Sequence, residues 1–195
     1  GRGLAGAGDV NGDGLADLLI GSAFGTPGGR GYVAFGKSTF TAIAASSLHA
    51  GTGGFSIQGH NLNDSAGDAL AAAGDTDGDG FFDILIGAPD FDEDGAGAGV
   101  FHGRGYMVLG KATTASVFLS AMGAGNGGLA MPGVASSDLA GSALSGVGDM
   151  NGDGMPDYIV GAHRTDTNGT NAGTAYVVFS NATPPIQGLY RQNQP

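Results

Sequence analysis

Three short segments of the chain carry closely spaced carboxylates. They share the pattern Asp-x-Asn/Asp-x-Asp-Gly-x-x-Asp and recur 66 and 74 residues apart without gaps. Carboxylates this close repel one another unless a positive charge lies between them. The chain has 18 acidic residues but only 7 Lys and Arg, for a net charge of −11, so its own side chains are too few to supply that charge. We therefore expect a bound cation in each segment.

The pattern supplies oxygen ligands of the kind that Ca²⁺ prefers, about six to eight per ion. Side chains at positions 1, 3 and 5 of a nine-residue loop converge on one point, and a glycine at position 6 makes the sharp turn. Position 7 offers its backbone carbonyl and position 9 closes the shell. The predicted ligands are Asp9, Asn11, Asp13, Leu15 and Asp17 in the first loop, Asp75, Asp77, Asp79, Phe81 and Asp83 in the second, and Asp149, Asn151, Asp153, Met155 and Asp157 in the third. We expect three Ca²⁺ sites, one per repeat.

Other metals and other calcium motifs fit the pattern less well. Oxygen ligands without His or Cys disfavour zinc and copper, and Mg²⁺ prefers to keep several waters. An EF-hand needs an acidic residue at position 12 and a helix after it, whereas position 12 here is Ile20, Ile86 or Val160 within an apolar run. What remains is a metal loop that joins two antiparallel strands.

Short apolar runs bounded by glycine surround each loop, and they predict strands. The predicted strands are 4–7, 18–21, 32–35 and 55–59, then 70–73, 84–87, 106–109 and 129–133, then 144–147, 158–161, 176–179 and 185–188. These runs do not alternate with polar residues, so both faces of each sheet should be covered. We predict an all-β fold, a β-propeller segment with three four-stranded blades over about 1–62, 63–135 and 136–195, in which the Ala/Gly-rich strand is innermost. The triplicated register disfavours the alternative, a generic Gly-rich β-sandwich.

The repeated segments resemble FG-GAP repeats, the units of the integrin alpha-subunit β-propeller and of many secreted bacterial proteins. The second unit matches best, because its loop is followed by Ile86-Gly87-Ala88-Pro89. The other two units lack this proline, and the Phe-Gly pair of the family is kept at residues 35–36 but altered at 109–110 and 179–180. The resemblance covers nearly the whole chain. It implies a calcium-bearing extracellular propeller without implying a particular ligand.

The number of repeats bears on the partners of the chain. Propellers of the family usually close with about seven blades, and three blades would leave apolar strands exposed at both ends. We therefore expect the chain to be a fragment of a longer propeller, or an arc that other copies of itself complete as a ring or a filament.

Composition and charge exclude several function classes. The acidic balance disfavours nucleic acid as a partner, and no apolar run approaches the length of about 18 residues expected of a membrane-spanning helix. No Cys, nucleophile elbow or histidine at triad spacing is present, so we do not expect an enzyme. An extracellular location is expected, because weak calcium sites fill at extracellular concentrations.

Strand alternation places the metal hairpins on one rim and loops 22–30, 88–104 and 162–173 on the other. Because variable loops on a rigid scaffold often bind ligands, we expect a protein or glycan ligand on the second rim. The sequence thus indicates a calcium-stabilised extracellular module for adhesion, recognition or assembly, in which calcium is structural. The alternatives are a carbohydrate-binding propeller lectin and an accessory propeller of a larger secreted hydrolase.

Overall fold

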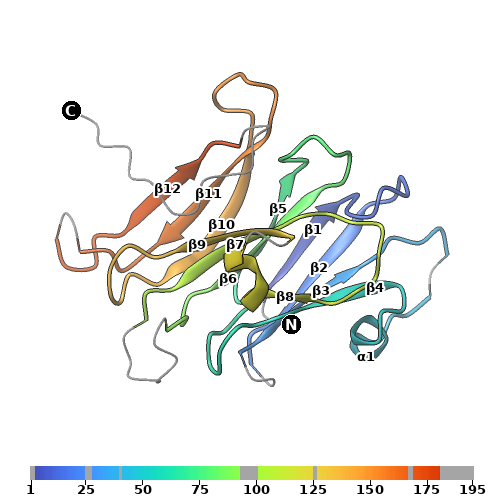
Figure 1. Ribbon diagram of the computed structural model, residues 1–195, viewed down its shortest axis with the longest axis horizontal. Helices are drawn as coiled ribbons and strands as arrows, with labels where there is room; N and C mark the ends of the chain where they lie inside the picture. Colours follow the sequence, from blue (N-terminus) through green and yellow to red (C-terminus); the bar gives the residue numbers. More distant parts are fainter. Residues whose placement is uncertain are drawn as a thin grey trace.

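The computed structural model describes residues 3–24, 28–39, 41–92, 101–124, 127–166 and 169–180, which form three sheets (Figure 1). The first sheet has the order β1 (Leu4–Gly8), β2 (Asp17–Ser22), β3 (Arg30–Ala34), β4 (Gly54–Gln58) and β8 (Val117–Phe118). The second has the order β5 (Leu70–Gly74), β6 (Asp83–Ala88), β7 (Arg104–Val108) and β9 (Gly128–Pro132). The third contains β10 (Ala140–Gly148), β11 (Asp157–Ala162) and β12 (Thr174–Val178). Two short helical segments, α1 (Ala45–His49) and η1 (Leu119–Ala124), lie outside the sheets.

Every strand predicted within the described residues is present, so the mostly β fold is confirmed. The strand predicted at 185–188 lies outside those residues. The expectation of uniform four-stranded units is wrong for the first sheet, because β8 crosses over from the second repeat. Its Val117 pairs in parallel with Ile57 of β4. Within the described part of the chain, the three sheets stand side by side and do not close into a ring (Figure 1).

The first strands of the three sheets come together, with β5 between β1 and β10 (Figure 1). These are the Ala/Gly-rich strands, and their small side chains permit a close approach of backbones. A Cβ atom on Gly146 of β10 would lie 2.4 Å from the carbonyl oxygen of Ala72 in β5. This proximity agrees with the expected inner position of the small-residue strands.

Apolar side chains fill the spaces on both faces of the second sheet. Toward the first sheet, Ile84, Ile86 and Tyr106 pack in one cluster with Leu19, Val33, Phe55 and Ile57. Toward the third sheet, Leu85, Met107 and Met131 pack with Tyr158 and Val160. All six residues of β6 are buried, which explains its unbroken apolar run. Each fully buried large aliphatic side chain contributes about 1.5–3 kcal/mol.

The antiparallel order fixes which connections share a rim. The β1–β2, β5–β6 and β10–β11 hairpins lie along the upper edge of Figure 1, and the β2–β3, β6–β7 and β11–β12 connections lie at the opposite ends of the same strands. Parts of these last connections, 25–27, 93–100 and 167–168, fall outside the described residues. No helix in the described residues is both long and apolar enough to span a membrane.

Candidate metal centre

The three acidic hairpins adopt the same turn, which the carboxylate at position 1 organises. In the first hairpin, Asp9 accepts backbone hydrogen bonds from Gly12 (2.7 Å), Asp13 (3.0 Å) and Gly14 (2.8 Å). Asp75 and Asp149 make the equivalent three bonds in the other hairpins. The glycine predicted to need a left-handed backbone at position 6 has φ of +84°, +91° and +90° in the three hairpins. The spacing of the pattern therefore produces one repeated geometry.

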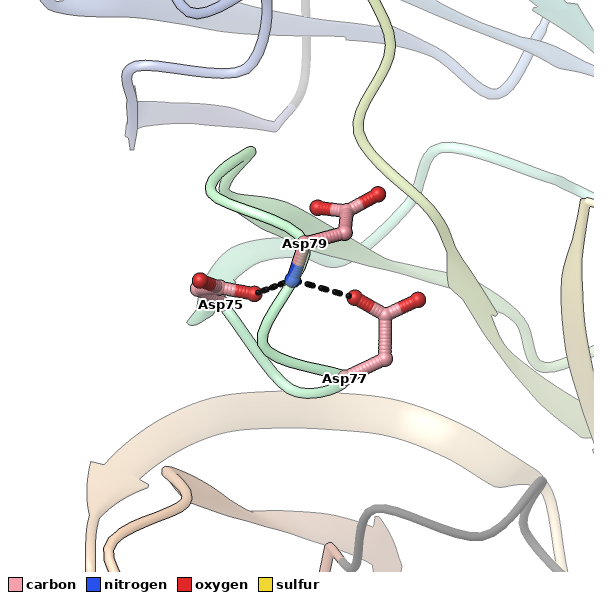
Figure 2. Close-up of side chains that lie close together, drawn as sticks. All are labelled: Asp75, Asp77 and Asp79. Atoms are coloured by element: carbon pink, nitrogen blue, oxygen red, sulfur yellow. Dashed lines mark hydrogen bonds between the residues drawn. The ribbon is translucent and has the colours of Figure 1, made fainter.

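The second hairpin brings three carboxylates together. One carboxylate oxygen from each of Asp75, Asp77 and Asp79 lies within 4.8 Å of the others. Figure 2 shows Asp75 and Asp77 on either side of the backbone nitrogen of Asp79, which donates to both, at 3.0 and 3.2 Å. Asp77 and Asp79 are exposed. Partial desolvation of this exposed carboxyl in the turn, followed by repulsion from Asp79, raises the pKa of Asp77 above its ordinary value.

The first and third hairpins have asparagine at position 3. The side-chain amide of Asn11 donates to Asp13 at 3.0 Å, and that of Asn151 donates to Asp153 at 2.9 Å. Each amide thus makes an attractive contact with the carboxylate at position 5. In the second hairpin the carboxylate of Asp77 takes this place and repels Asp79 instead. The second hairpin consequently has the strongest need for a cation.

Position 9 has a different environment from positions 1, 3 and 5. Asp83 and Asp157 are fully buried, and Asp17 is 4% exposed. One oxygen of each carboxylate accepts from the backbone N–H of position 2. The other accepts from the backbone N–H two residues beyond the end of the third strand, at Gly36, Gly110 or Ser180. Burial raises the pKa of Asp83 to about 6. These aspartates therefore tie each hairpin to its sheet, and their predicted role as ligands stays a prediction.

Position 7 contributes a further hydrogen bond to the turn. The backbone N–H groups of Leu15, Phe81 and Met155 donate to the carboxylates at position 5, at 2.8–2.9 Å. That contact orients the aspartate at position 5. The assignment of the position 7 carbonyls as ligands likewise stays a prediction.

The donor set fits a hard cation. The grouped atoms are carboxylate oxygens on an exposed turn, and the three repeated turns contain neither His nor Cys, the residues that favour zinc. Such a set suits Ca²⁺, which tolerates flexible, carboxylate-rich loops. Chemically, the arrangement is suited to holding a divalent cation between carboxylates.

Of the three buried aspartates that the structure describes outside the pattern, Asp64, Asp92 and Asp138, the first and the last were missed in the sequence. Asp64 and Asp138 lie in the connections that lead into β5 and β10, and they are 0% and 3% exposed. Each accepts a backbone hydrogen bond from the residue three positions earlier, Asn61 at 2.6 Å and Ala135 at 3.0 Å. The signal was present, because Gly-x₄-Asp-x-Ala-Gly occurs at residues 59–67 and again at 133–141.

Asp64 lies near Arg104, at the start of β7. Burial raises the pKa of Asp64 to about 6, and the positive charge of Arg104 opposes that shift. The Arg104 guanidinium stacks 3.8 Å from the centre of the Phe91 ring. The connection between the first and second sheets is therefore fixed by a charged and aromatic cluster.

Comparison with known proteins supports the repeat assignment. The model of the FG-GAP repeat matches residues 1–34 and 66–102. Integrin alpha-V of Gallus gallus is 33% identical over 163 residues, 82% of this chain. Integrin alpha-4 of Xenopus laevis is 30% identical over 170 residues (83% of the chain), and integrin alpha-PS2 of Drosophila melanogaster is 31% identical over 168 residues (81%).

The chain is short relative to these proteins. It spans 14% of the length of integrin alpha-V and of integrin alpha-4, and 11% of integrin alpha-PS2. The two stretches that match the FG-GAP repeat contain the first and second acidic hairpins and the strands on either side of each. The chain thus carries FG-GAP repeats and is distantly similar to integrin alpha subunits over most of its length.

Proposed function

We propose that the chain is a non-catalytic, extracellular β-propeller module in which Ca²⁺ at the three hairpins has a structural role. The cluster of Asp75, Asp77 and Asp79 carries this proposal, because three carboxylates within 4.8 Å repel one another without a cation. The same turn in the first and third hairpins extends the proposal to Asp9, Asn11 and Asp13, and to Asp149, Asn151 and Asp153. Integrin-like repeats support a role in adhesion, recognition or assembly.

Thermal unfolding tests the structural role. An ion that binds the folded state but not the unfolded state raises stability in proportion to the logarithm of its concentration. We expect the melting midpoint to rise by several degrees in millimolar Ca²⁺ relative to chelator, and to rise much less in equal Mg²⁺. An identical midpoint in calcium and in chelator would rule out a structural ion.

A partner surface is proposed on the outer face of the first sheet. Leu4 and Leu18 on that face are 69% and 45% exposed. The residues at the same register of the second sheet, Leu70 and Ile84, pack against the first sheet. The proposed occupant is therefore another sheet of the same repeat type, from further blades or from another copy of the chain. Mass in solution distinguishes a monomer from a closed ring and from an open polymer.

Ligand recognition is proposed for the rim opposite the hairpins. Leu62, in the connection between β4 and β5, is 71% exposed, and Val134, in the connection between β9 and β10, is 61% exposed. Apolar side chains on connecting loops are suited to contact a protein or glycan. Replacement of both residues by serine should weaken the binding of such a ligand without changing the affinity for Ca²⁺. Unchanged ligand binding would exclude this surface.

A further inference from the structure

The first and second hairpins are joined directly by their backbones. The N–H of Phe82, at position 8 of the second hairpin, donates to the carbonyl of Asp9 at 2.9 Å. Asp9 is position 1 of the first hairpin, and its side chain organises that turn. This hydrogen bond therefore gives a change in the second hairpin a direct route to the first.

Aromatic side chains reinforce this contact. A Cβ atom on Gly8 would lie 1.8 Å from Cδ2 of Phe82, and one on Gly12 would lie 2.7 Å from Cε1 of Phe81. The two rings of the second hairpin thus rest on glycines of the first. Both glycines also have positive φ, +75° and +74°, so this part of the turn has little room for another residue.

A third link runs through the segment after β7. The N–H of Gly110 donates to Oδ1 of Asp83 at 2.8 Å, and the next N–H, of Lys111, donates to the carbonyl of Val10 at 2.8 Å. This short segment therefore holds both hairpins at once, one through a side chain and the other through the backbone.

The second and third hairpins make a weaker contact. Pro156 occupies the position of Phe82, and proline has no N–H to donate. Among the described residues the contact is one of packing: a Cβ on Gly74 would lie 2.8 Å from Cγ of Pro156, and one on Gly78 would lie 3.3 Å from Cε of Met155. The two pairs of neighbouring hairpins thus differ at one chemically decisive position.

We propose that the first and second hairpins bind Ca²⁺ cooperatively, through the bond from Phe82 N–H to the Asp9 carbonyl, and that the third is coupled to the second more weakly. The proposal rests on calcium binding at the hairpins. Ordering of the second hairpin fixes the Phe82 peptide, which in turn holds Asp9 in its turn. Coupling is reciprocal, and one backbone hydrogen bond gives a factor of about five in affinity.

A calcium titration followed by amide NMR tests the coupling one hairpin at a time. The resonances of Gly14, Gly80 and Gly154 report the three turns separately. In a D77A/D79A variant, which alters exposed side chains of the second hairpin, the affinity at Gly14 should fall about fivefold and that at Gly154 less than twofold. The matched N151A/D153A variant of the third hairpin should leave Gly14 unchanged.

Substitutions at position 8 identify the route. Phe82→Pro, which copies the third hairpin, should reduce the effect of D77A/D79A on Gly14 to less than twofold, whereas Phe82→Ala keeps the N–H and should retain the larger effect. Pro156→Ala, which creates an N–H donor in the third hairpin, should raise the coupling between the second and third hairpins. This test remains valid even if the Phe82→Pro variant does not fold.

The outcomes separate the two proposals. Suppose that all three glycines respond to Ca²⁺ in the wild-type chain, and that the dissociation constant read at Gly14 is the same in D77A/D79A. The coupling is then refuted, while calcium binding stands. If none of the three responds to Ca²⁺, calcium binding and the coupling both fail.

Discussion

The junction between the first and second sheets differs from the junction between the second and third, although both arise from the same repeat. The first junction has a backbone hydrogen bond between hairpins, from Phe82 to Asp9. At the opposite rim it has the buried Asp64, whose pKa burial raises and the positive charge of Arg104 lowers. At the second junction, Pro156 replaces Phe82 and Thr174 occupies the register position of Arg104.

This comparison teaches that the repeat specifies the turn but not the strength of the contact between sheets. Position 1 aspartates make the same three hydrogen bonds in all three hairpins. Some contacts between sheets recur at both junctions, such as the bridges from Gly29 to Ala66 and from Gly103 to Ala140. The contacts that distinguish the two junctions come instead from positions where the repeats differ. Stability and calcium response should therefore be unequal along the chain.

The largest expected effect is at Arg104. Arg104→Ala should destabilise the protein by about 3 kcal/mol, because it leaves the buried carboxylate of Asp64 without its nearby positive charge and removes the stack on Phe91. The matched control is Arg30→Ala, at the same register of the first sheet, for which we expect about 1 kcal/mol or less. Urea unfolding measures both, and equal losses for the two variants would contradict a special first junction.

Alanine substitution at three equivalent glycines should give a graded series. Gly8, Gly74 and Gly148 all precede position 1 and have φ between +72° and +88°, which alone costs about 1 kcal/mol for alanine. A Cβ would meet Phe82 at 1.8 Å in the first and Pro156 at 2.8 Å in the second, whereas no described residue comes within 4 Å in the third. We expect Gly8→Ala to lose about 1–2 kcal/mol more than Gly148→Ala, with Gly74→Ala between them.

Thermal or urea unfolding in chelator measures this series without a contribution from calcium. The reverse order, or three equal losses, would show that the hairpins do not press on one another as the contacts indicate.

A smaller effect is expected in the pH dependence of the free energy of unfolding, through Asp64 at the first junction. Because the folded-state pKa of Asp64 is about 6, above its ordinary value of 3.8, the folded protein holds this proton more tightly. The free energy of unfolding should therefore fall as pH rises from about 4 to 6. Neighbouring His60 acts in the opposite direction, because burial, followed by the charge of Arg104, lowers its pKa.

The contribution of Asp64 is isolated by difference. Asp64→Asn keeps an acceptor for the N–H of Asn61 and should remove this descending component, whereas the matched Asp138→Asn should preserve it. Unfolding free energies at pH 4.5 and 7 in chelator provide the measurement. A pH profile unchanged by Asp64→Asn would contradict the assignment.

The sequence predicted the local parts of this structure. Apolar runs bounded by glycine predicted the strands, and the spacing of Asp75, Asp77 and Asp79 with Gly80 predicted the turn, because both depend on neighbours along the chain. The crossing of β8 to pair with β4 depends on two segments that lie 60 residues apart, Ile57 with Val117, and no local pattern specifies it.

Long-range contacts also explain what was missed at the site. Asp83 fits the ligand pattern, but its burial and its bond from Gly110 arise only once β7 is in place. Phe82 looks like any apolar residue after a turn, and its contact with Asp9 requires the first hairpin as a neighbour. The burial of Asp64 was not predicted because its neighbours in the sequence are polar, although the spacing Gly-x₄-Asp-x-Ala-Gly occurs twice and distinguishes this aspartate.

The number of calcium ions bound per chain tests the central claim most directly. Equilibrium dialysis of the purified chain against millimolar Ca²⁺, with the bound metal counted, should give three ions per chain, and D77A/D79A should give two. Retention of no calcium by the folded wild-type chain would contradict the account.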